Sequence, residues 1–156
     1  MVENLRKSLR DSAAARWTAL VIVSFTMMCG YFLTDIMAPL AGLLEGQLGW
    51  SRADYGTFTS SYGWFNVFLL MLIFGGIILD KLGVRLTGLG AAGVMVAGTA
   101  IKYWAVSTDA LEGATLFGLD AQVFWASIGF ATFAVGVEVA GITVSKIIVK
   151  WFKGKE

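Results

Sequence analysis

The sequence predicts an all-α membrane protein with four transmembrane helices and both termini in the cytoplasm. Of the 156 residues, 57% are hydrophobic and 15% are charged, whereas soluble domains carry about 25% charged residues. The apolar residues form continuous runs long enough to cross a bilayer as helices, which takes about 20 residues. A membrane β-barrel would instead show short segments of alternating polarity. The cations fall mostly on one side of these runs, and this defines the orientation.

The four predicted spans are separated by segments in which the charged residues gather. In chain order, the spans are 17–44, 55–79, 86–106 and 121–149. The connecting segments are an N-terminal lead-in at 1–16, outer loops at 45–54 and 107–120, an inner signature loop at 80–85 and the start of a further inner loop at 150–156. The first apolar run is too long for a signal peptide.

The orientation follows from the distribution of lysine and arginine. Ten of the twelve lysine and arginine residues lie in the lead-in, in the loop between spans two and three, or at the end of the fourth span. The charged residues of the two outer loops are mostly acidic. Cytoplasmic loops are enriched in lysine and arginine, so both termini are predicted to be cytoplasmic. The expected location is the cytoplasmic membrane of a cell.

The composition argues against several function classes. The chain has no histidine and one cysteine, so histidine metal sites, Ser-His-Asp catalysis and dithiol exchange lack their residues. A net charge of +1 leaves no basic face for nucleic acid. We therefore expect no enzyme activity, no metal, no cofactor and no nucleic acid partner. The expected partners are membrane lipid and a small-molecule solute.

Two acidic residues lie inside predicted spans, where an ionisable group costs about 2.5–3.5 kcal/mol. Asp35 is in the outer half of span one, and Tyr31 shares its helical face. Glu138 is near the middle of span four. Both carboxylates are candidates for binding a cation, a proton or a substrate amine in a water-filled cavity. The alternative is that each is neutral or pairs with a basic residue for assembly. Glu138 is the stronger candidate because it lies deeper.

Polar and small residues mark two further helical faces. In span two, Tyr62 and Asn66 continue a polar stripe at helical spacing, and the Asn66 amide either lines the cavity or bonds to another helix. Lys102 in span three is interpreted as a boundary anchor that snorkels, and Cys29 as a core residue. In span three, the small-residue pairs predict close helix packing. The span interleaves Gly88, Gly90, Gly93 and Gly98 with Ala91, Ala92 and Ala97, which form pairs such as Gly88/Ala92 and Gly93/Ala97.

The inner loop carries the most specific motif. Residues 76–85 read Gly-Ile-Ile-Leu-Asp-Lys-Leu-Gly-Val-Arg, where the first glycine permits close packing, the second makes a turn, and the aspartate accepts from cations such as Arg85. This segment resembles the signature loop of the major facilitator superfamily, G-x-x-x-D-[RK]-x-G-x-R, between its second and third helices. The resemblance implies that the chain corresponds to helices 1–4 of a twelve-helix transporter working by alternating access. It also implies an inner latch that closes against a helix of the second half. The latch residues would be Gly76, Asp80, Lys81, Gly83 and Arg85.

Further stretches resemble the branch of this superfamily that contains lysosomal dipeptide carriers. They are 31–35, 62–67, the Gly-Val-Glu at 136–138 and the Lys-Trp-Phe-Lys-Gly-Lys-Glu at 150–156. The resemblance implies that Asp35, Asn66 and Glu138 line a central cavity and meet the amino end of a peptide-like substrate or a coupled proton. The family often has an arginine in its fourth helix where this chain has Phe130. A lysosomal membrane is the alternative location.

The expected function is therefore that of the N-terminal part of a secondary active or facilitative transporter for peptide-like or other small organic solutes. Such a chain is either a truncated product or a chain that assembles with others, since the remaining helices would complete the cavity. The alternative is a complete small four-helix membrane protein that acts as an oligomeric transporter or as an assembly subunit.

Overall fold

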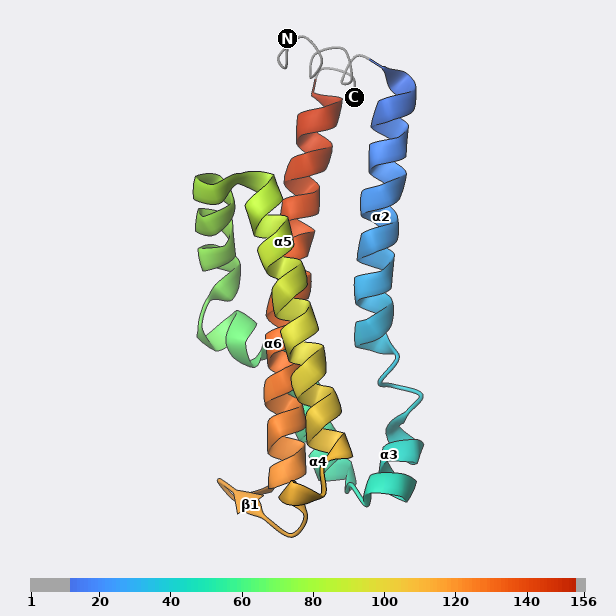
Figure 1. The fold of residues 1–156 in the computed structure, drawn as a ribbon, viewed down its shortest axis with the longest axis vertical. Helices are drawn as coiled ribbons and strands as arrows, with labels where there is room; N and C mark the ends of the chain where they lie inside the picture. Colours follow the sequence, from blue (N-terminus) through green and yellow to red (C-terminus); the bar gives the residue numbers. More distant parts are fainter. Residues whose placement is uncertain (1–11, 154–156) are drawn as a thin grey trace.

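The computed structural model describes residues 12–153, which form an elongated helical bundle (Figure 1). The elements in chain order are α2 (Ala13–Asp35), α3 (Ala41–Leu48), α4 (Arg52–Ser60), the π-helical segment η1 (Trp64–Phe68), α5 (Met71–Ser107), the 3₁₀ turn η2 (Asp109–Leu111), strands β1 (Thr115–Leu116) and β2 (Leu119–Asp120), and α6 (Ala121–Phe152). Most of the predicted lead-in and the last residues of the final loop lie outside the described residues.

Three helices are long and apolar enough to cross a membrane, namely α2, α5 and α6. The chain is therefore a helical membrane protein by composition and fold, whereas four continuous spans are not what the structure contains. The predicted second span, 55–79, is divided among α4, η1 and the first part of α5. The division falls at Leu70, whose backbone is left-handed with φ 50° and ψ 38°, a conformation that a leucine rarely adopts.

Helix α5 reverses direction at Gly83, where φ is 76° and ψ is 171°. A positive φ of this kind favours glycine because a Cβ would clash there. The predicted turn is confirmed at this residue, although helix continues on both sides of it. The two arms, 71–82 and 84–107, run antiparallel (Figure 1), and the predicted third span lies within the second arm.

The first predicted span, 17–44, is too long. Helix α2 ends at Asp35 and is followed by turns and the short helix α3. Pro39 lies in these turns and cannot continue a helix, because it lacks a backbone donor and restricts the residue before it. Asp35 is thus the last residue of its helix and not an interior one. The fourth predicted span is confirmed as a continuous helix, α6, which continues three residues beyond 149.

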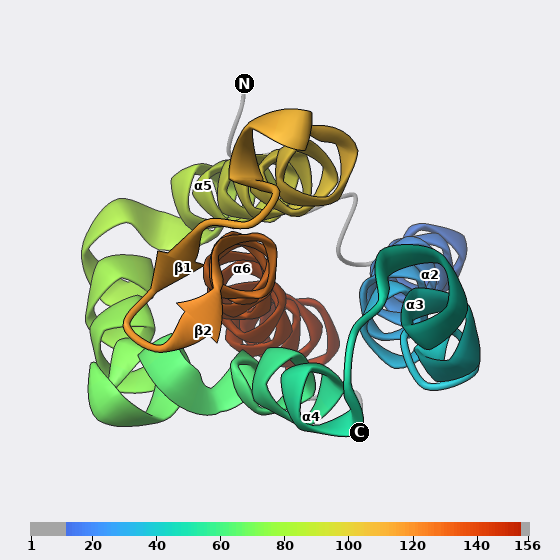
Figure 2. The ribbon, with the colours of Figure 1, turned by 90° about the horizontal axis from the view of Figure 1, so that it is seen from below.

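Helix α6 lies at the centre of the bundle, with α5, α4 and α2 around it (Figure 2). Its closest contact is with the second arm of α5. A Cβ added to Gly98 would lie 2.4 Å from the backbone nitrogen of Phe133, and one added to Gly129 would lie 2.7 Å from that of Lys102. The two backbones therefore meet directly, as small residues permit between membrane helices.

The predicted close packing of span three is confirmed, at Gly98 and Ala91 of the small residues named for it but not at the two pairs Gly88/Ala92 and Gly93/Ala97. Gly93 has open space around its Cα, and Gly88 has only an ordinary contact with Thr143. Ala92 and Ala97 are exposed. The face that meets α6 instead contains Ala91, Met95, Gly98, Lys102 and Ala105.

Candidate functional site

The candidate site is centred on a hydrogen bond between Tyr62 and Glu138. The Tyr62 hydroxyl donates to Oε1 of Glu138 over 2.5 Å. Tyr62 lies between α4 and η1, whereas Glu138 lies in the middle of α6, and both side chains are half-buried. A hydrogen bond to an ionised carboxylate is about twice as strong as a neutral one. The bond therefore ties the irregular segment around η1 to the central helix.

Asn66 adds a polar group to this pair from within η1. Its side chain is 8% exposed, and its Nδ2 donates to the backbone carbonyl of Tyr62 over 3.2 Å. Its Oδ1 is buried and accepts no hydrogen bond from the residues that the structure describes. An unsatisfied buried acceptor is rare in folded proteins, and short π-helical turns are frequent at functional sites. The structure thus brings Tyr62 and Glu138 together, and it places Asn66 one helical turn from Tyr62 with an acceptor that no described residue satisfies.

The other two candidates, Tyr31 and Asp35, come from α2. Both interact electrostatically with the Tyr62 hydroxyl, so they face the same region at longer range. Both side chains are exposed, and neither is hydrogen-bonded to Tyr62 or Glu138 in the described part of the chain. Cys29, on the same helix, is exposed, so its assignment to the core is wrong.

Aromatic rings form the wall beside the Tyr62–Glu138 pair. The Phe130 ring stacks on Phe58 with centroids 4.9 Å apart, and the Tyr62 ring lies 5.7 Å from it. Trp50 continues the cluster against Phe58 at 5.4 Å and donates from Nε1 to Oε1 of Gln122 over 3.0 Å. The position at which the resemblance led us to expect an arginine is therefore a buried aromatic ring.

Sequence reasoning missed the role of Lys102 in this region. The structure places its Nζ 4.9 Å from the centroid of Phe130 and 4.6 Å from that of Phe133. It is thus directed against the aromatic wall, and its interpretation as a boundary anchor is wrong. The helical spacing contained a signal, because Lys102 follows Gly98 by four residues and so shares the face that packs on α6.

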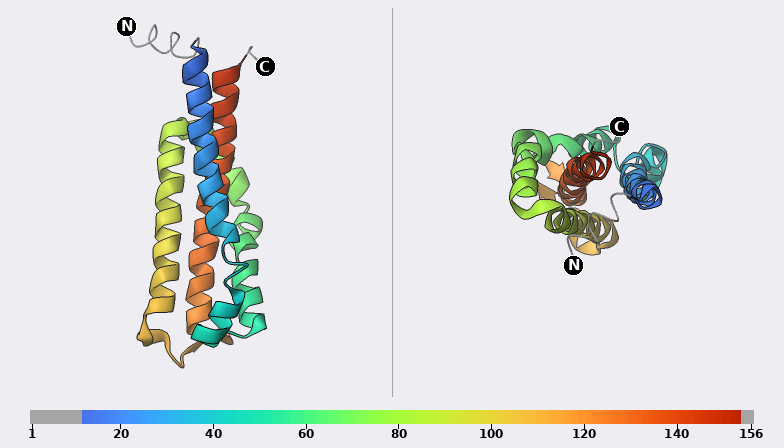
Figure 3. Two further views of the ribbon diagram at one scale, coloured as in Figure 1. Left: turned by 90° about the vertical axis from the view of Figure 1, so that its right-hand side faces the viewer. Right: turned by 90° about the horizontal axis from the view of Figure 1, so that it is seen from above.

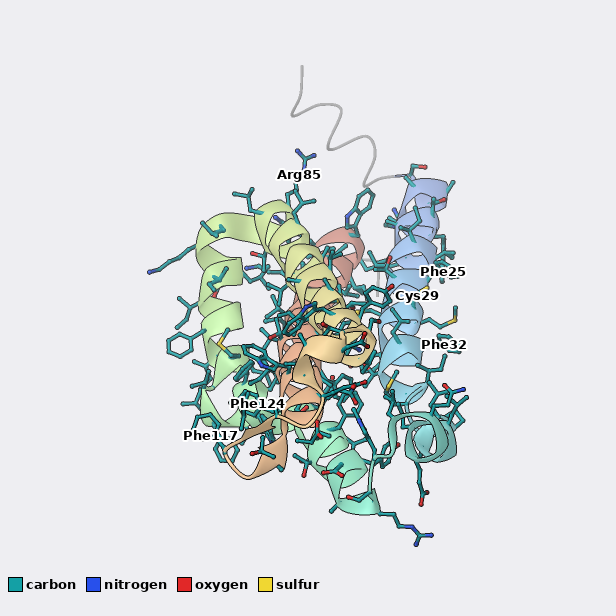
Figure 4. The ribbon with its side chains drawn as sticks, turned by 60° about the horizontal axis from the view of Figure 1, so that its bottom comes forward. Phe25, Cys29, Phe32, Arg85, Phe117 and Phe124 are labelled. Carbon is teal, nitrogen blue, oxygen red and sulfur yellow. The ribbon has the colours of Figure 1, made fainter. Side chains whose placement is uncertain are left out.

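The inner signature loop lies at the opposite end of α6 from the outer hairpin of β1 and β2. Lys146 of α6 donates to Oδ1 of Asp80 over 2.5 Å, so the partner of Asp80 is Lys146 and not Arg85. Arg85 points away from the bundle (Figure 4). Lys81 is also exposed. The expected cation for Asp80 is therefore wrong.

The glycine that packs closely in this segment is Gly75 and not Gly76. A Cβ on Gly75 would lie 2.9 Å from Cγ2 of Val139, whereas Gly76 has open space. Within residues 12–153, no three histidine, cysteine, aspartate or glutamate side chains form a group that could hold a metal ion.

One curated protein is similar to this chain over most of its length. It is named probable anion transporter 4, chloroplastic, from Oryza sativa subsp. japonica, and is 26% identical over 137 residues. The alignment covers 87% of this chain and 20% of the relative, so the chain spans about a fifth of that protein's length. No family model and no solved structure matches the chain. The apolar helices indicate a membrane protein, and the relative that it resembles is named a transporter.

Proposed function

We propose that the chain is part of a secondary active or facilitative solute transporter that works by alternating access, as in the major facilitator superfamily. The Tyr62–Glu138 hydrogen bond carries the proposal. Acidic residues in the middle of membrane helices usually belong to the path of a solute or a proton. Irregular backbone at membrane depth is tolerated where it is buried in protein or lines a cavity, and η1 with the break at Leu70 is such a segment.

The geometry supports a coupling between binding and movement. Tyr62 occupies Oε1 of Glu138, so a proton or a substrate amine that binds this carboxyl weakens or replaces the tyrosine hydrogen bond. Loss of that bond frees η1 from α6. The Asp80–Lys146 ion pair holds the Gly83 turn to the same helix at its other end, where the resemblance places an inner latch. In this proposal, a change at the Tyr62–Glu138 contact alters the Asp80–Lys146 contact, because both contacts involve α6.

The solute is a small organic molecule, and two chemistries fit the site. A peptide-like solute would bring its amino group to Glu138. A small anion, the class named for the rice relative, would be repelled by an ionised Glu138, so its transport would go with protonation of that residue. Further helices, in the same polypeptide or in other chains, complete the cavity in a lipid membrane. We place the protein in the cytoplasmic membrane of a cell, and we propose no enzyme activity or cofactor.

The test is uptake by the full protein reconstituted in proteoliposomes, with radiolabelled dialanine and radiolabelled benzoate as probes and with or without a proton gradient. We expect Glu138→Gln to remove the response to the gradient and Tyr62→Phe to lower the rate at least about tenfold, because the bond to a charged group is lost. Tyr103→Phe is the matched control, since Tyr103 is 71% exposed. Uptake by Glu138→Gln with the wild-type response to the gradient would overturn the proposal.

A further inference from the structure

We propose that the β1–β2 hairpin docks on the membrane surface, where the Phe117 side chain inserts among the headgroups of zwitterionic phospholipids. The hairpin belongs to the loop between α5 and α6, to which the transport function proposed above gives no role. The inference depends on the chain being a membrane protein and not on the solute that it carries, so the two proposals can fail separately.

Phe117 lies at the tip of the hairpin in a backbone conformation that phenylalanine rarely adopts. Leu116 pairs with Leu119, so Phe117 and Gly118 form a two-residue turn, with φ of 53° and 80°. Such turns favour glycine, asparagine and aspartate, and a phenylalanine in this region is strained. The Phe117 side chain is also 90% exposed, more than any other large apolar side chain among residues 12–153. An exposed ring held at a strained position indicates a contact made outside the chain.

The hairpin lies at the level where a membrane surface is expected, because it connects the end of one candidate span, α5, to the start of another, α6. A row of aromatic rings extends from its tip across both helices. The Phe117 centroid lies 5.6 Å from that of Phe124, and the centroids of Phe124 and Trp104 each lie 5.8 Å from that of Trp125. Figure 4 shows Phe117 and Phe124 together on the side of the bundle away from α2. Tryptophan is enriched where hydrocarbon meets headgroups, so the surface next to Phe117 is the membrane interface.

The charges of the loop determine which headgroups fit. Residues 107–120 contain Asp109, Glu112 and Asp120 but no lysine or arginine, and the three acidic side chains are exposed. Anionic lipids attract basic segments, so this loop repels them. Phosphatidylcholine and phosphatidylethanolamine carry an ammonium group, which is attracted by carboxylates and by the face of an aromatic ring. A zwitterionic phospholipid is therefore the partner that fits the hairpin.

The first test locates position 117 relative to lipid, in the full protein reconstituted in phosphatidylcholine nanodiscs. Cys29 is the only cysteine, so Phe117→Cys in a Cys29→Ala background carries a single nitroxide spin label. Collisions with oxygen, which concentrates in lipid, are compared with collisions with a water-soluble nickel complex. We expect the oxygen-to-nickel ratio to be at least about threefold higher than in the control Glu112→Cys, because only position 117 lies in the interface. Equal ratios, or protection of position 117 from both reagents by a protein surface, would overturn the proposal.

The second test keeps Phe117 and asks whether it anchors the hairpin. The spin label is placed by Thr115→Cys, at an exposed position of β1. Phe117→Asn should raise the label's mobility at least about twofold, because asparagine suits the turn but lacks the apolar group that binds the interface. Phe117→Trp should leave the mobility unchanged, and phosphatidylglycerol in place of phosphatidylcholine should raise it. Unchanged mobility in Phe117→Asn would contradict the anchor, and equal mobility in the two lipids would contradict the zwitterionic partner.

Discussion

The contact between the second arm of α5 and α6 differs sharply from the contact between α2 and α6. In the first, backbones touch at Gly98 and Gly129. Around them, Ala105, Val123 and Phe133 are at most 1% exposed. In the second, no residue of α2 is buried. Helix α2 stands to one side of α5 and α6 (Figure 3), and its contact with α6 includes an edge-on pair of the Trp17 and Phe152 rings.

The difference is not one of hydrophobicity, since both helices are apolar enough to cross a membrane. Phe25 and Phe32, which Figure 4 labels on α2, are 61% and 63% exposed. Lipid is as apolar as these side chains, so burying them against protein gains little. Close approach between membrane helices comes instead from small residues in register, and α6 has them where it meets α5. The apolar runs therefore determine which segments lie in the membrane, and the positions of the glycines determine which helices pack closely against each other.

The largest expected effect is at Gly98. Substitution Gly98→Leu would place its Cβ 2.4 Å from the nitrogen of Phe133 and 2.6 Å from the carbonyl oxygen of Gly129, so the two helices have to separate. We expect little or no monodisperse protein by size-exclusion chromatography in detergent. The control is Gly93→Leu, on the same arm but in open space, which should behave as wild type. If both variants behave alike, the helices do not pack in this register.

An intermediate effect on stability is expected when a buried aromatic ring is removed, in comparison with removal of an exposed one. Phe133 is 1% exposed and Phe25 is 61% exposed. We expect Phe133→Ala to lower the free energy of unfolding by about 3–5 kcal/mol, as for other buried rings. Phe25→Ala should change it by less than about 0.5 kcal/mol, as for substitutions away from packed sites. Denaturant titration in detergent micelles measures both values. A large loss for Phe25→Ala would mean that α2 is held by protein at that position.

The smallest expected effect on stability is at the Gly83 turn. The side chains of Lys146 and Asp80 are 38% and 78% exposed, and ion pairs in such surroundings contribute about 0–1 kcal/mol. We expect Asp80→Asn to insert into the membrane and unfold as wild type does, while uptake falls strongly because the turn is no longer held to α6. Lys146→Met should match it, since each removes the same pair. Normal uptake by both variants at normal expression would contradict a latch at this turn.

Much of the fold is visible in local patterns, and the candidate site is visible only in part. The apolar run from Ala121 predicts α6, and glycine at position 83 predicts the turn, because each depends on a residue's own properties. The break at Leu70 has no such signal, since leucine has no local preference for a left-handed backbone. The sequence pointed to Glu138, Tyr62 and Asn66 separately, as polar groups in apolar surroundings. That Tyr62 donates to Glu138 across 76 positions depends on how three segments pack.

Composition and periodicity alone determined that this is a helical membrane protein, because transfer into lipid depends on the apolar content of each segment and not on its neighbours. The tertiary structure decided which glycines touch α6, which cation pairs with Asp80 and where the Lys102 ammonium points. These outcomes depend on the relative rotation and depth of packed helices. Since 3.6 residues complete each helical turn, a shift of one residue rotates a helix face by 100°. Such a shift would turn the half-buried Lys102 from the aromatic rings of α6 toward the surface.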